Sequence, residues 1–183
     1  MREGLLFVSS NAGKIGEVVA ILGRPVERLD LDLPEIQALE VDEVARHKAL
    51  TAFERAGRPV VVEDTGLYIE ALGGLPGALV RWFLGTIGAG GICDLIPRGA
   101  DRAARARTAV AYCEGGAVEV FSGETQGAIV AAPAGRGGFG WDPIFRPAGA
   151  SRTFAEMEMA EKTVYSMRRQ ALERLRDRMS SAE

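Results

Sequence analysis

Two adjacent carboxylates, Glu63 and Asp64, directly follow three valines at positions 60–62. A run of β-branched residues is typical of a buried strand. We expect this strand to end at the carboxylates, with a turn at Thr65 and Gly66. Burying a carboxylate costs several kcal/mol unless a cation or hydrogen-bond donors compensate. The sequence therefore predicts positive charge opposite this pair.

A divalent cation is one way to supply that charge. The chain has a single histidine, His47, so oxygen atoms are the available ligands, and they favour Mg²⁺ or Mn²⁺ bridged to phosphate oxygens. Glu35 could provide a third carboxylate. The alternative is structural: Asp64 caps a helix or a turn, and Glu63 pairs with a lysine.

The stretch between the first expected strand and the first expected helix could bind phosphate. It reads Ser9-Ser10-Asn11-Ala12-Gly13-Lys14. Backbone N–H groups and the helix dipole attract anions at a helix start, and the polar side chains add donors. The stretch is not a Walker loop, because Val8 and Ile15 occupy two of that motif's required positions. An ordinary helix cap with a surface lysine is the alternative.

Residues 135–140 satisfy the spacing GxGxxG, but Pro143 follows where a dinucleotide-binding helix should begin. We therefore expect a flexible loop. Phe139 and Trp141 could stack on a planar base, with Asp142 accepting hydrogen bonds from it. The alternative is a hydrophobic plug in which the two aromatic rings close the sheet.

Lys162, Arg168 and Arg169 lie within two turns of an expected helix. Lys162 and one of the arginines could converge on an anion or a carbonyl group, although most basic residues on such a helix form its solvated face. Met167 falls on the apolar stripe, so its expected place is the core.

Hydrophobic periodicity predicts an α/β order for the first part of the chain. The expected elements are a strand over 4–10, a helix with Ile15, Val18, Val19 and Leu22 on one face, a strand over 26–33, a helix over 41–56 and the strand that begins at Val60. This order implies right-handed crossovers and a sheet with functional groups at its strand ends.

The rest of the chain predicts a change to antiparallel pairing. The expected elements are helices over 78–90 and 91–96, a hairpin of strands over 105–113 and 117–130, a loop rich in Gly and Pro over 131–149, and a packed helix from Ala160 to Met179. The hairpin would turn at Glu114-Gly115-Gly116.

Composition limits the classes of protein. The 183 residues fit one domain that buries a core without disulfides. A net charge of −3 with 47% hydrophobic residues is typical of a soluble globular protein and indicates no extended nucleic-acid binding. Cys93 and Cys113 form no CxxC pair, and the usual zinc ligand sets are excluded. With no signal segment and no run of about 18 apolar residues, we expect a cytoplasmic protein without a membrane partner.

A set of motifs runs along the chain in a fixed order: SSNAGKIGE (9–17), LPEIQ (33–37), VEDTGLYIEALGGLPG (62–77), RWFL (81–84), GFGWDPIF (138–145), TFAEM (153–157), and AEK with SMRRQAL (160–172). Together they resemble the motifs of the inosine triphosphate pyrophosphatase family. The resemblance covers essentially the whole chain. Three of these motifs are closer in sequence to the eukaryotic and archaeal branch of that family than to the common bacterial one: VEDTGL, GGLPG and WFL.

The resemblance implies an enzyme that hydrolyses non-canonical purine nucleoside triphosphates (ITP, dITP and XTP) to the monophosphate and pyrophosphate, and so cleanses the nucleotide pool. It implies a single α/β domain over residues 1–183. The expected fold is an elongated mixed sheet flanked by helices, with a parallel N-terminal part, a long antiparallel hairpin and a ligand cleft between two lobes. Mg²⁺ would be the cofactor, with Mn²⁺ as a substitute, and the chain would form a homodimer.

The resemblance also implies roles for individual residues. Asp64, as the base for water, Glu63 and Lys48 would be catalytic, and Glu35 and Asp64 would hold the metal. The triphosphate side would comprise the stretch from Ser9 to Lys14 with Lys48 and Arg81. Further substrate contacts would come from Thr65, Phe139, Gly140, Trp141, Asp142, Lys162, Met167 and Arg168.

One position departs from the family pattern. Where the family has Ser-His-Arg, this chain has Ser166-Met167-Arg168. The usual histidine helps form the purine end of the pocket, so its loss bears on how sharply 6-keto purines are separated from adenine. Two further functions stay open: a broad-specificity nucleoside triphosphate pyrophosphatase, and a nucleotide-binding module without turnover.

Overall fold

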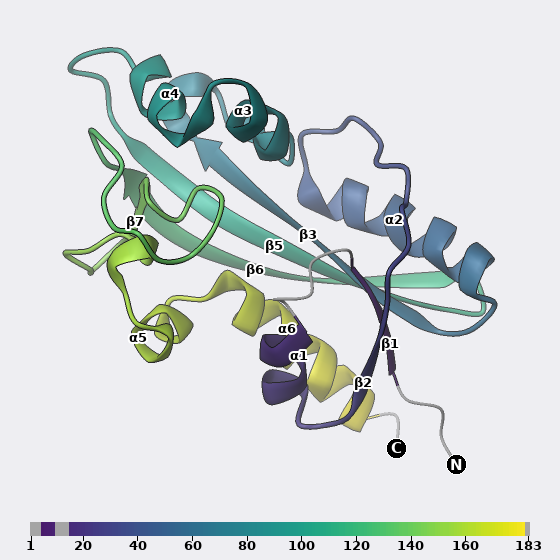
Figure 1. Cartoon of the computed structure of the whole chain (residues 1–183). Coiled ribbons are helices and arrows are strands. Elements are labelled where there is room, and N and C mark those ends of the chain that lie inside the picture. Colours follow the sequence, from purple (N-terminus) through teal and green to yellow (C-terminus); the bar gives the residue numbers. More distant parts are fainter. Residues whose placement is uncertain (1–4, 10–14, 182–183) are drawn as a thin grey trace. The chain divides into compact units, whose positions relative to one another are not determined.

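The computed structural model describes residues 5–9 and 15–181. Within them the chain is a mixed α/β protein built on a seven-stranded sheet (Figure 1). The strand order is β2-β1-β3-β5-β6-β7, and β4 pairs with β3 beside this path. The strands are β1 (Leu5–Val8), β2 (Val26–Leu29), β3 (Val60–Ile69), β4 (Pro76–Gly77), β5 (Ala103–Glu114), β6 (Ala117–Ile129) and β7 (Phe145–Pro147).

Helices connect the strands. The α-helices of the described residues are α1 (Ile15–Leu22), α2 (Val41–Ala56), α3 (Val80–Thr86), α4 (Gly88–Leu95), α5 (Met159–Val164) and α6 (Met167–Ser180), and the 3₁₀ turns are η2 (Glu70–Leu72) and η3 (Phe154–Glu156). In this part of the chain, no helix combines the length and the apolar character that crossing a membrane requires.

The predicted parallel start of the sheet is confirmed. β1 pairs in parallel with both β2 and β3, with Leu6 opposite Glu27 on one side and Val60 on the other. The sheet also contains antiparallel pairs, β3 with β4 and β6 with β7. The two long predicted strands are present as β5 and β6, which are neighbours in the sheet and are joined through Gly115 and Gly116.

The prediction that the strand ends at the carboxylates is wrong. β3 is ten residues long and extends from Val60 to Ile69. Glu63 and Asp64 therefore lie within the strand, and Thr65 and Gly66 form no turn. The reason is cross-strand pairing that no local pattern reveals: Leu67 and Tyr68 pair with β4. A carboxylate inside a strand cannot cap a helix, so this part of the structural alternative for Asp64 also fails.

The predicted helix from Ala160 to Met179 is two helices. α5 ends at Val164 and α6 begins at Met167. Between them the carbonyl of Tyr165 accepts a hydrogen bond from the Thr125 hydroxyl at 2.5 Å, which fixes the break. The second predicted strand also ends early, at Leu29, and the predicted boundary between the two middle helices shifts to Ile87, which lies between α3 and α4.

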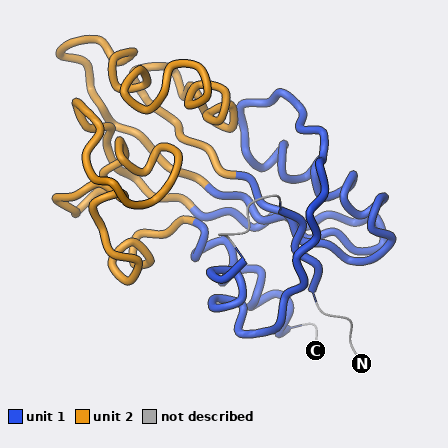
Figure 2. Tube along the Cα trace, viewed as in Figure 1, with its two compact units in different colours: residues 1–64, 108–123, 168–183 blue, residues 65–107, 124–167 orange. Residues whose placement is uncertain are grey.

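The chain divides into two compact units (Figure 2). Unit 1 comprises residues 1–64, 108–123 and 168–183, and unit 2 comprises 65–107 and 124–167. In unit 1, α1 and α6 lie side by side (Figure 1), and Val18 of α1 shares a core with Leu172 and Leu175 of α6. In unit 2, Trp141, Phe145 and other apolar residues form a second core. Each unit therefore has a core of its own.

Candidate active site

Lys48 joins two of the predicted carboxylates in unit 1. Its Nζ lies 2.9 Å from Glu35 Oε1 and 3.3 Å from Asp64 Oδ1. It also donates to the backbone carbonyl of Glu63 at 3.2 Å. Glu35 comes from the segment between β2 and α2, Lys48 from α2 and Asp64 from β3. Three residues that the sequence singled out therefore meet at one ammonium group.

The composition of α2 explains how Lys48 reaches β3. The buried positions of this helix hold small residues: Val41, Val44, Ala45, Ala49 and Ala52. Small side chains allow close approach of a helix to the layer that it packs on. Lys48 precedes Ala49, and its side chain is only 14% exposed, so the aliphatic stem is buried while the ammonium group meets the carboxylates.

The charge state of Lys48 follows from these neighbours. Burial by itself would lower the pKa of Lys48, but the Asp64 and Glu35 carboxylates outweigh burial and raise the pKa above its ordinary value. Lys48 is therefore a cation at neutral pH. It can neutralise negative charge, and it cannot serve as a general base.

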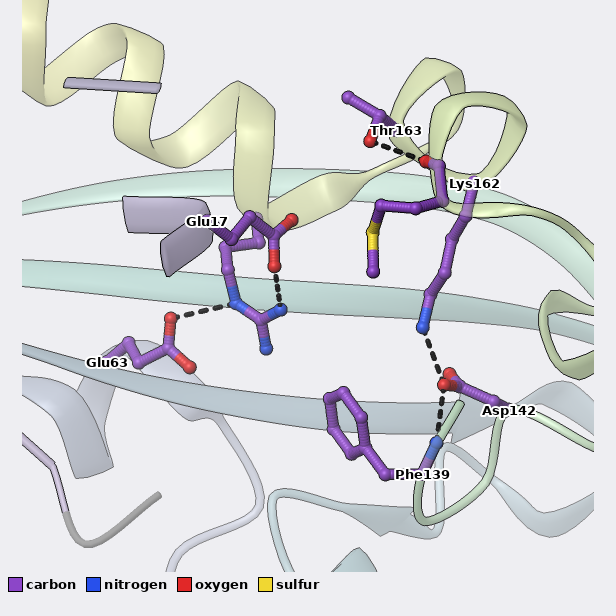
Figure 3. A network of polar contacts seen from close by, with 8 residues as sticks. Glu17, Glu63, Phe139, Asp142, Lys162 and Thr163 are labelled. Carbon is purple, nitrogen blue, oxygen red and sulfur yellow. Dashed lines mark hydrogen bonds and ion pairs between the residues drawn. The ribbon is translucent and has the colours of Figure 1, made fainter. Parts of the chain in front are cut away.

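Glu63 has a different cation, Arg168. Arg168 Nε donates to Glu63 Oε2 at 2.9 Å, and its Nη1 donates to Glu17 Oε2 at 2.6 Å (Figure 3). The Glu63 side chain is 1% exposed and that of Arg168 is 7% exposed. The predicted positive charge opposite the carboxylate pair is thus present, and an arginine supplies it for Glu63.

Sequence reasoning missed two aspects of this ion-pair network. Glu17 lies within the motif SSNAGKIGE, yet no role was assigned to it. Arg168 was expected on a solvated face or at the nucleotide, and the structure buries it. Burial alone would lower the pKa of Arg168, but the Glu63 and Glu17 carboxylates raise it. Arg168 is therefore a permanent cation between the two carboxylates.

Two acidic oxygens of this region are buried without a hydrogen bond. They are Oε1 of Glu63 and Oδ2 of Asp64, although the other oxygen of each carboxylate is paired. Across residues 5–9 and 15–181, no group of three or more His, Cys, Asp or Glu side chains is arranged to hold a metal ion. The predicted metal ligands Glu35 and Asp64 are present as a pair that shares Lys48.

Unit 2 holds the predicted base-side residues Phe139, Asp142 and Lys162. Lys162 Nζ lies 2.5 Å from Asp142 Oδ2, and the same oxygen accepts the Phe139 N–H at 2.8 Å (Figure 3). The Phe139 ring is 52% exposed, and the Lys162 ammonium lies 5.0 Å from its centroid. An exposed aromatic ring beside a cation can stack on a planar base.

Trp141 and Met167 belong to the core of unit 2. Trp141 is 7% exposed and packs edge-on against Phe145 at 5.5 Å between ring centroids. The hydrophobic-plug alternative thus describes Trp141 but not the exposed Phe139. Met167 is buried, as its place on the apolar stripe predicted. Substrate contacts by Trp141 and Met167 remain predictions.

The other predicted site residues are described only in part. The carbonyl of Ser9 accepts a hydrogen bond from Arg28 at 2.9 Å, Thr65 is half-buried in β3, and Arg81 is exposed on α3 with its guanidinium 5.4 Å from the Trp82 ring centroid. Gly140 has a φ of 59°, a conformation that favours glycine. Ser10, Asn11, Ala12, Gly13 and Lys14 lie outside the described residues, so phosphate binding by this stretch stays a prediction.

The structure is that of a mixed α/β protein in which buried cations pair with carboxylates of the sheet. The model of the Ham1 family matches residues 5–178, and the chain belongs to this family. The recognition made from the motifs is therefore confirmed.

Relatives of known name span nearly the whole chain. It is 45% identical over 174 residues to a dITP/XTP pyrophosphatase of Methanopyrus kandleri, covering 93% of each chain. It is 43% identical over 186 residues to an inosine triphosphate pyrophosphatase of Tuber melanosporum, covering 99% of each. A HAM1 protein structure from Coxiella burnetii superposes with a TM-score of 0.85 at 29% identity, covering 97% of this chain and 99% of that one. The archaeal and eukaryotic relatives agree with the predicted branch.

Proposed function

We propose that this protein hydrolyses ITP, dITP and XTP to the nucleoside monophosphate and pyrophosphate, and so removes non-canonical purines from the nucleotide pool. The observation that carries the proposal is the convergence of Glu35 and Asp64 on Lys48, in a chain 45% identical to a dITP/XTP pyrophosphatase. Opposite charges held together at low exposure are typical of sites that bind and cleave phosphate esters and anhydrides.

In the proposed reaction a water oxygen attacks the α-phosphorus, and the bond from that phosphorus to the bridging oxygen of the β-phosphate breaks. Asp64 accepts the proton that the water loses. Lys48, which stays protonated at neutral pH, offsets the negative charge that develops on the phosphate oxygens. Arg168 pairs with Glu63, the residue before Asp64 in β3, and so supplies the cation that the buried Glu63 carboxylate requires.

The residues present fit a divalent cation. Glu35 and Asp64 each place a carboxylate oxygen against the same ammonium group, so the two carboxylates are already held close enough to face one cation. Hard oxygen ligands of this kind suit Mg²⁺, and also Mn²⁺. When bound, the ion would neutralise phosphate charge and lower the pKa of a coordinated water. Lys48 would hold the carboxylates together in its absence.

The second candidate is a broad-specificity nucleoside triphosphate pyrophosphatase. Met167, which stands where the family has a histidine, favours it, because a thioether has no hydrogen-bond donor for a 6-keto oxygen. A hydrogen bond donor is what would separate a keto purine from adenine by a large factor. A binding module without turnover is the third candidate, and the paired charges around Lys48 argue against it.

Pyrophosphate release from ITP, XTP, GTP and ATP, measured in parallel at equal concentration with Mg²⁺, tests all three functions. Faster hydrolysis of ITP and XTP by about 100-fold, or roughly 2.7 kcal/mol of transition-state discrimination, supports the proposed function. Equal rates support the broad-specificity enzyme. Binding of the four nucleotides without pyrophosphate release would leave the binding module.

We also propose a single functional domain over residues 1–183 and a homodimer. The apolar side chains of Leu75 and Trp82, exposed by 42% and 59%, support an interface on this part of unit 2. Light scattering of the wild-type protein and of Trp82→Glu tests the assembly, since a charge in the interface would shift the mass to that of one chain. The cytoplasmic location stays a prediction.

A further inference from the structure

The turn that carries Phe139 is closed at both ends by Asp142. The carboxylate oxygen Oδ2 of Asp142 accepts the N–H of Phe139 at 2.8 Å. In return, the N–H of Asp142 donates to the carbonyl of Phe139 at 3.1 Å. Reciprocal bonds between a side chain and the backbone of a four-residue turn restrict its conformations. The place of the exposed Phe139 ring therefore depends on Asp142.

The same carboxylate oxygen holds Lys162. Lys162 Nζ lies 2.5 Å from Asp142 Oδ2, and the ammonium group lies between two rings, 5.0 Å from the centroid of Phe139 and 5.2 Å from that of Phe154. Charge-assisted hydrogen bonds are stronger than neutral ones, and aromatic faces attract the cation. One oxygen atom of Asp142 therefore bonds both the backbone of Phe139 and the ammonium group of Lys162, and so fixes the positions of both residues.

Asp142 is itself enclosed. Its side chain is 4% exposed, and its carbonyl accepts the N–H of Ala155 at 3.2 Å. Gly138 has a φ of 70°, and a Cβ at this position would collide with the Asp142 carboxylate. The chain is therefore folded tightly around this side chain. Phe139 is 52% exposed and the Lys162 side chain 18%, so a base that stacks on Phe139 would meet the ring first, with the Asp142 carboxylate covered.

We infer that Asp142 is a positioning residue: it fixes the Phe139 ring and the Lys162 ammonium group for the purine base and does not contact the base. The family resemblance had placed Asp142 among the substrate contacts. The part that concerns the base rests on the proposed function, whereas the part that concerns Phe139 and Lys162 is a property of the free protein. The two parts need separate measurements.

The first measurement is amide hydrogen exchange at Phe139, followed by NMR without nucleotide. We expect Asp142→Ala to speed exchange by about 10-fold or more, because the N–H loses its acceptor. Asp142→Asn keeps an oxygen acceptor and should retain protection, which also covers the case in which the alanine variant fails to fold. Glu124→Gln, an acid-to-amide change at the Arg105 ion pair of the same unit, is the matched control. Unchanged exchange in Asp142→Ala overturns the inference.

The second measurement is a double-mutant cycle on ITP hydrolysis with Asp142→Asn and Lys162→Met. If Asp142 acts through Lys162, Asp142→Asn raises KM about 10-fold with kcat nearly unchanged, and this effect disappears when Lys162 is already Met. An undiminished effect in the Lys162→Met background shows direct contact with the base and overturns the inference. If the wild-type enzyme releases no pyrophosphate, the proposed function fails, and hydrogen exchange alone still decides the positioning role.

Discussion

The charged residues of unit 1 and those of unit 2 are held by different means. In unit 1, Glu63 and Arg168 are almost completely buried, and the cluster draws on α1, α2, β3, α6 and the segment before α2. In unit 2, Asp142 comes from one turn and Lys162 from the short helix α5, and the Lys162 ammonium group lies near Phe139, which is about half exposed. The first set draws on more elements of the chain than the second, although Asp142 is itself buried.

This difference follows from the cost of burying charge. A buried charge without a partner is strongly destabilising, so each carboxylate of unit 1 needs its cation in a fixed place if the fold is to be stable. The stability of the fold and the geometry of the proposed catalytic carboxylates are therefore coupled there. Phe139 costs little to expose, and its ring can meet a ligand without a change in the buried charges of unit 1. We expect substitutions in unit 1 to affect turnover or folding, and those in unit 2 to affect substrate affinity.

The largest effect should come from Asp64→Asn. The amide keeps the shape but cannot accept the proton of the attacking water, and loss of a general base lowers kcat by about 1,000-fold. Pyrophosphate release under saturating ITP measures this, with Glu43→Gln on the exposed side of α2 as the matched control. A variant that turns over within about threefold of wild type would remove Asp64 from the mechanism.

The second test concerns folding. Arg168→Met removes the guanidinium that pairs with the buried Glu63 carboxylate, and we expect the free energy of unfolding to fall by about 3 kcal/mol. Its neighbour provides the control, because Arg169 is 46% exposed and pairs with Glu173 one turn away. Arg169→Met should cost less than about 0.5 kcal/mol. Urea unfolding of both variants measures the difference, and equal losses would contradict the claim that the buried ion pairs of unit 1 stabilise the fold more than its exposed ones.

The parts of the fold that could be predicted from sequence are those that depend on local residues, and the parts that could not depend on distant ones. Periodicity is local, so α1, α2 and the hairpin of β5 and β6 could be placed from sequence alone. β3 could not be followed past Asp64, because Thr65 and Gly66 favour a turn, whereas pairing with strands from other parts of the chain keeps β3 extended. The helix break at Tyr165 depends on Thr125, forty residues away in sequence.

The candidate site divides in the same way. The family resemblance implied roles for Glu35, Lys48 and Asp64, and the structure brings these three residues together. The partners of Arg168 were not predictable, since Glu63 and Glu17 lie 105 and 151 residues away in sequence. Ion pairs at that separation leave no local signal. Only the cost of an unpaired buried carboxylate indicated that a cation had to be present.

The third test separates the two phenylalanines of unit 2. Phe139→Leu removes an exposed ring, and we expect KM for ITP to rise about 10-fold, the value of one stacking contact, with little change in stability. Phe154→Leu alters a fully buried ring and should cost about 1.5 kcal/mol of stability. Steady-state kinetics and thermal unfolding of both variants check this, and a stability loss in Phe139→Leu would show that its turn is as constrained as unit 1.

The smallest expected effect is a pH dependence of stability from Lys48. Its pKa is raised in the folded protein, because the carboxylates of Asp64 and Glu35 outweigh burial. A raised folded pKa means that the contribution to stability is fully present below the unfolded value and is lost as pH rises through the folded value.

The difference in unfolding free energy between wild type and Lys48→Met, measured by urea unfolding without added metal, should therefore stay constant within about 0.5 kcal/mol from pH 7 to 9. It should shrink only above about pH 10.5, the ordinary lysine value. A difference that already changes near pH 8 would show that Lys48 can lose its proton at working pH, and Lys48 would then no longer be a fixed cation of unit 1.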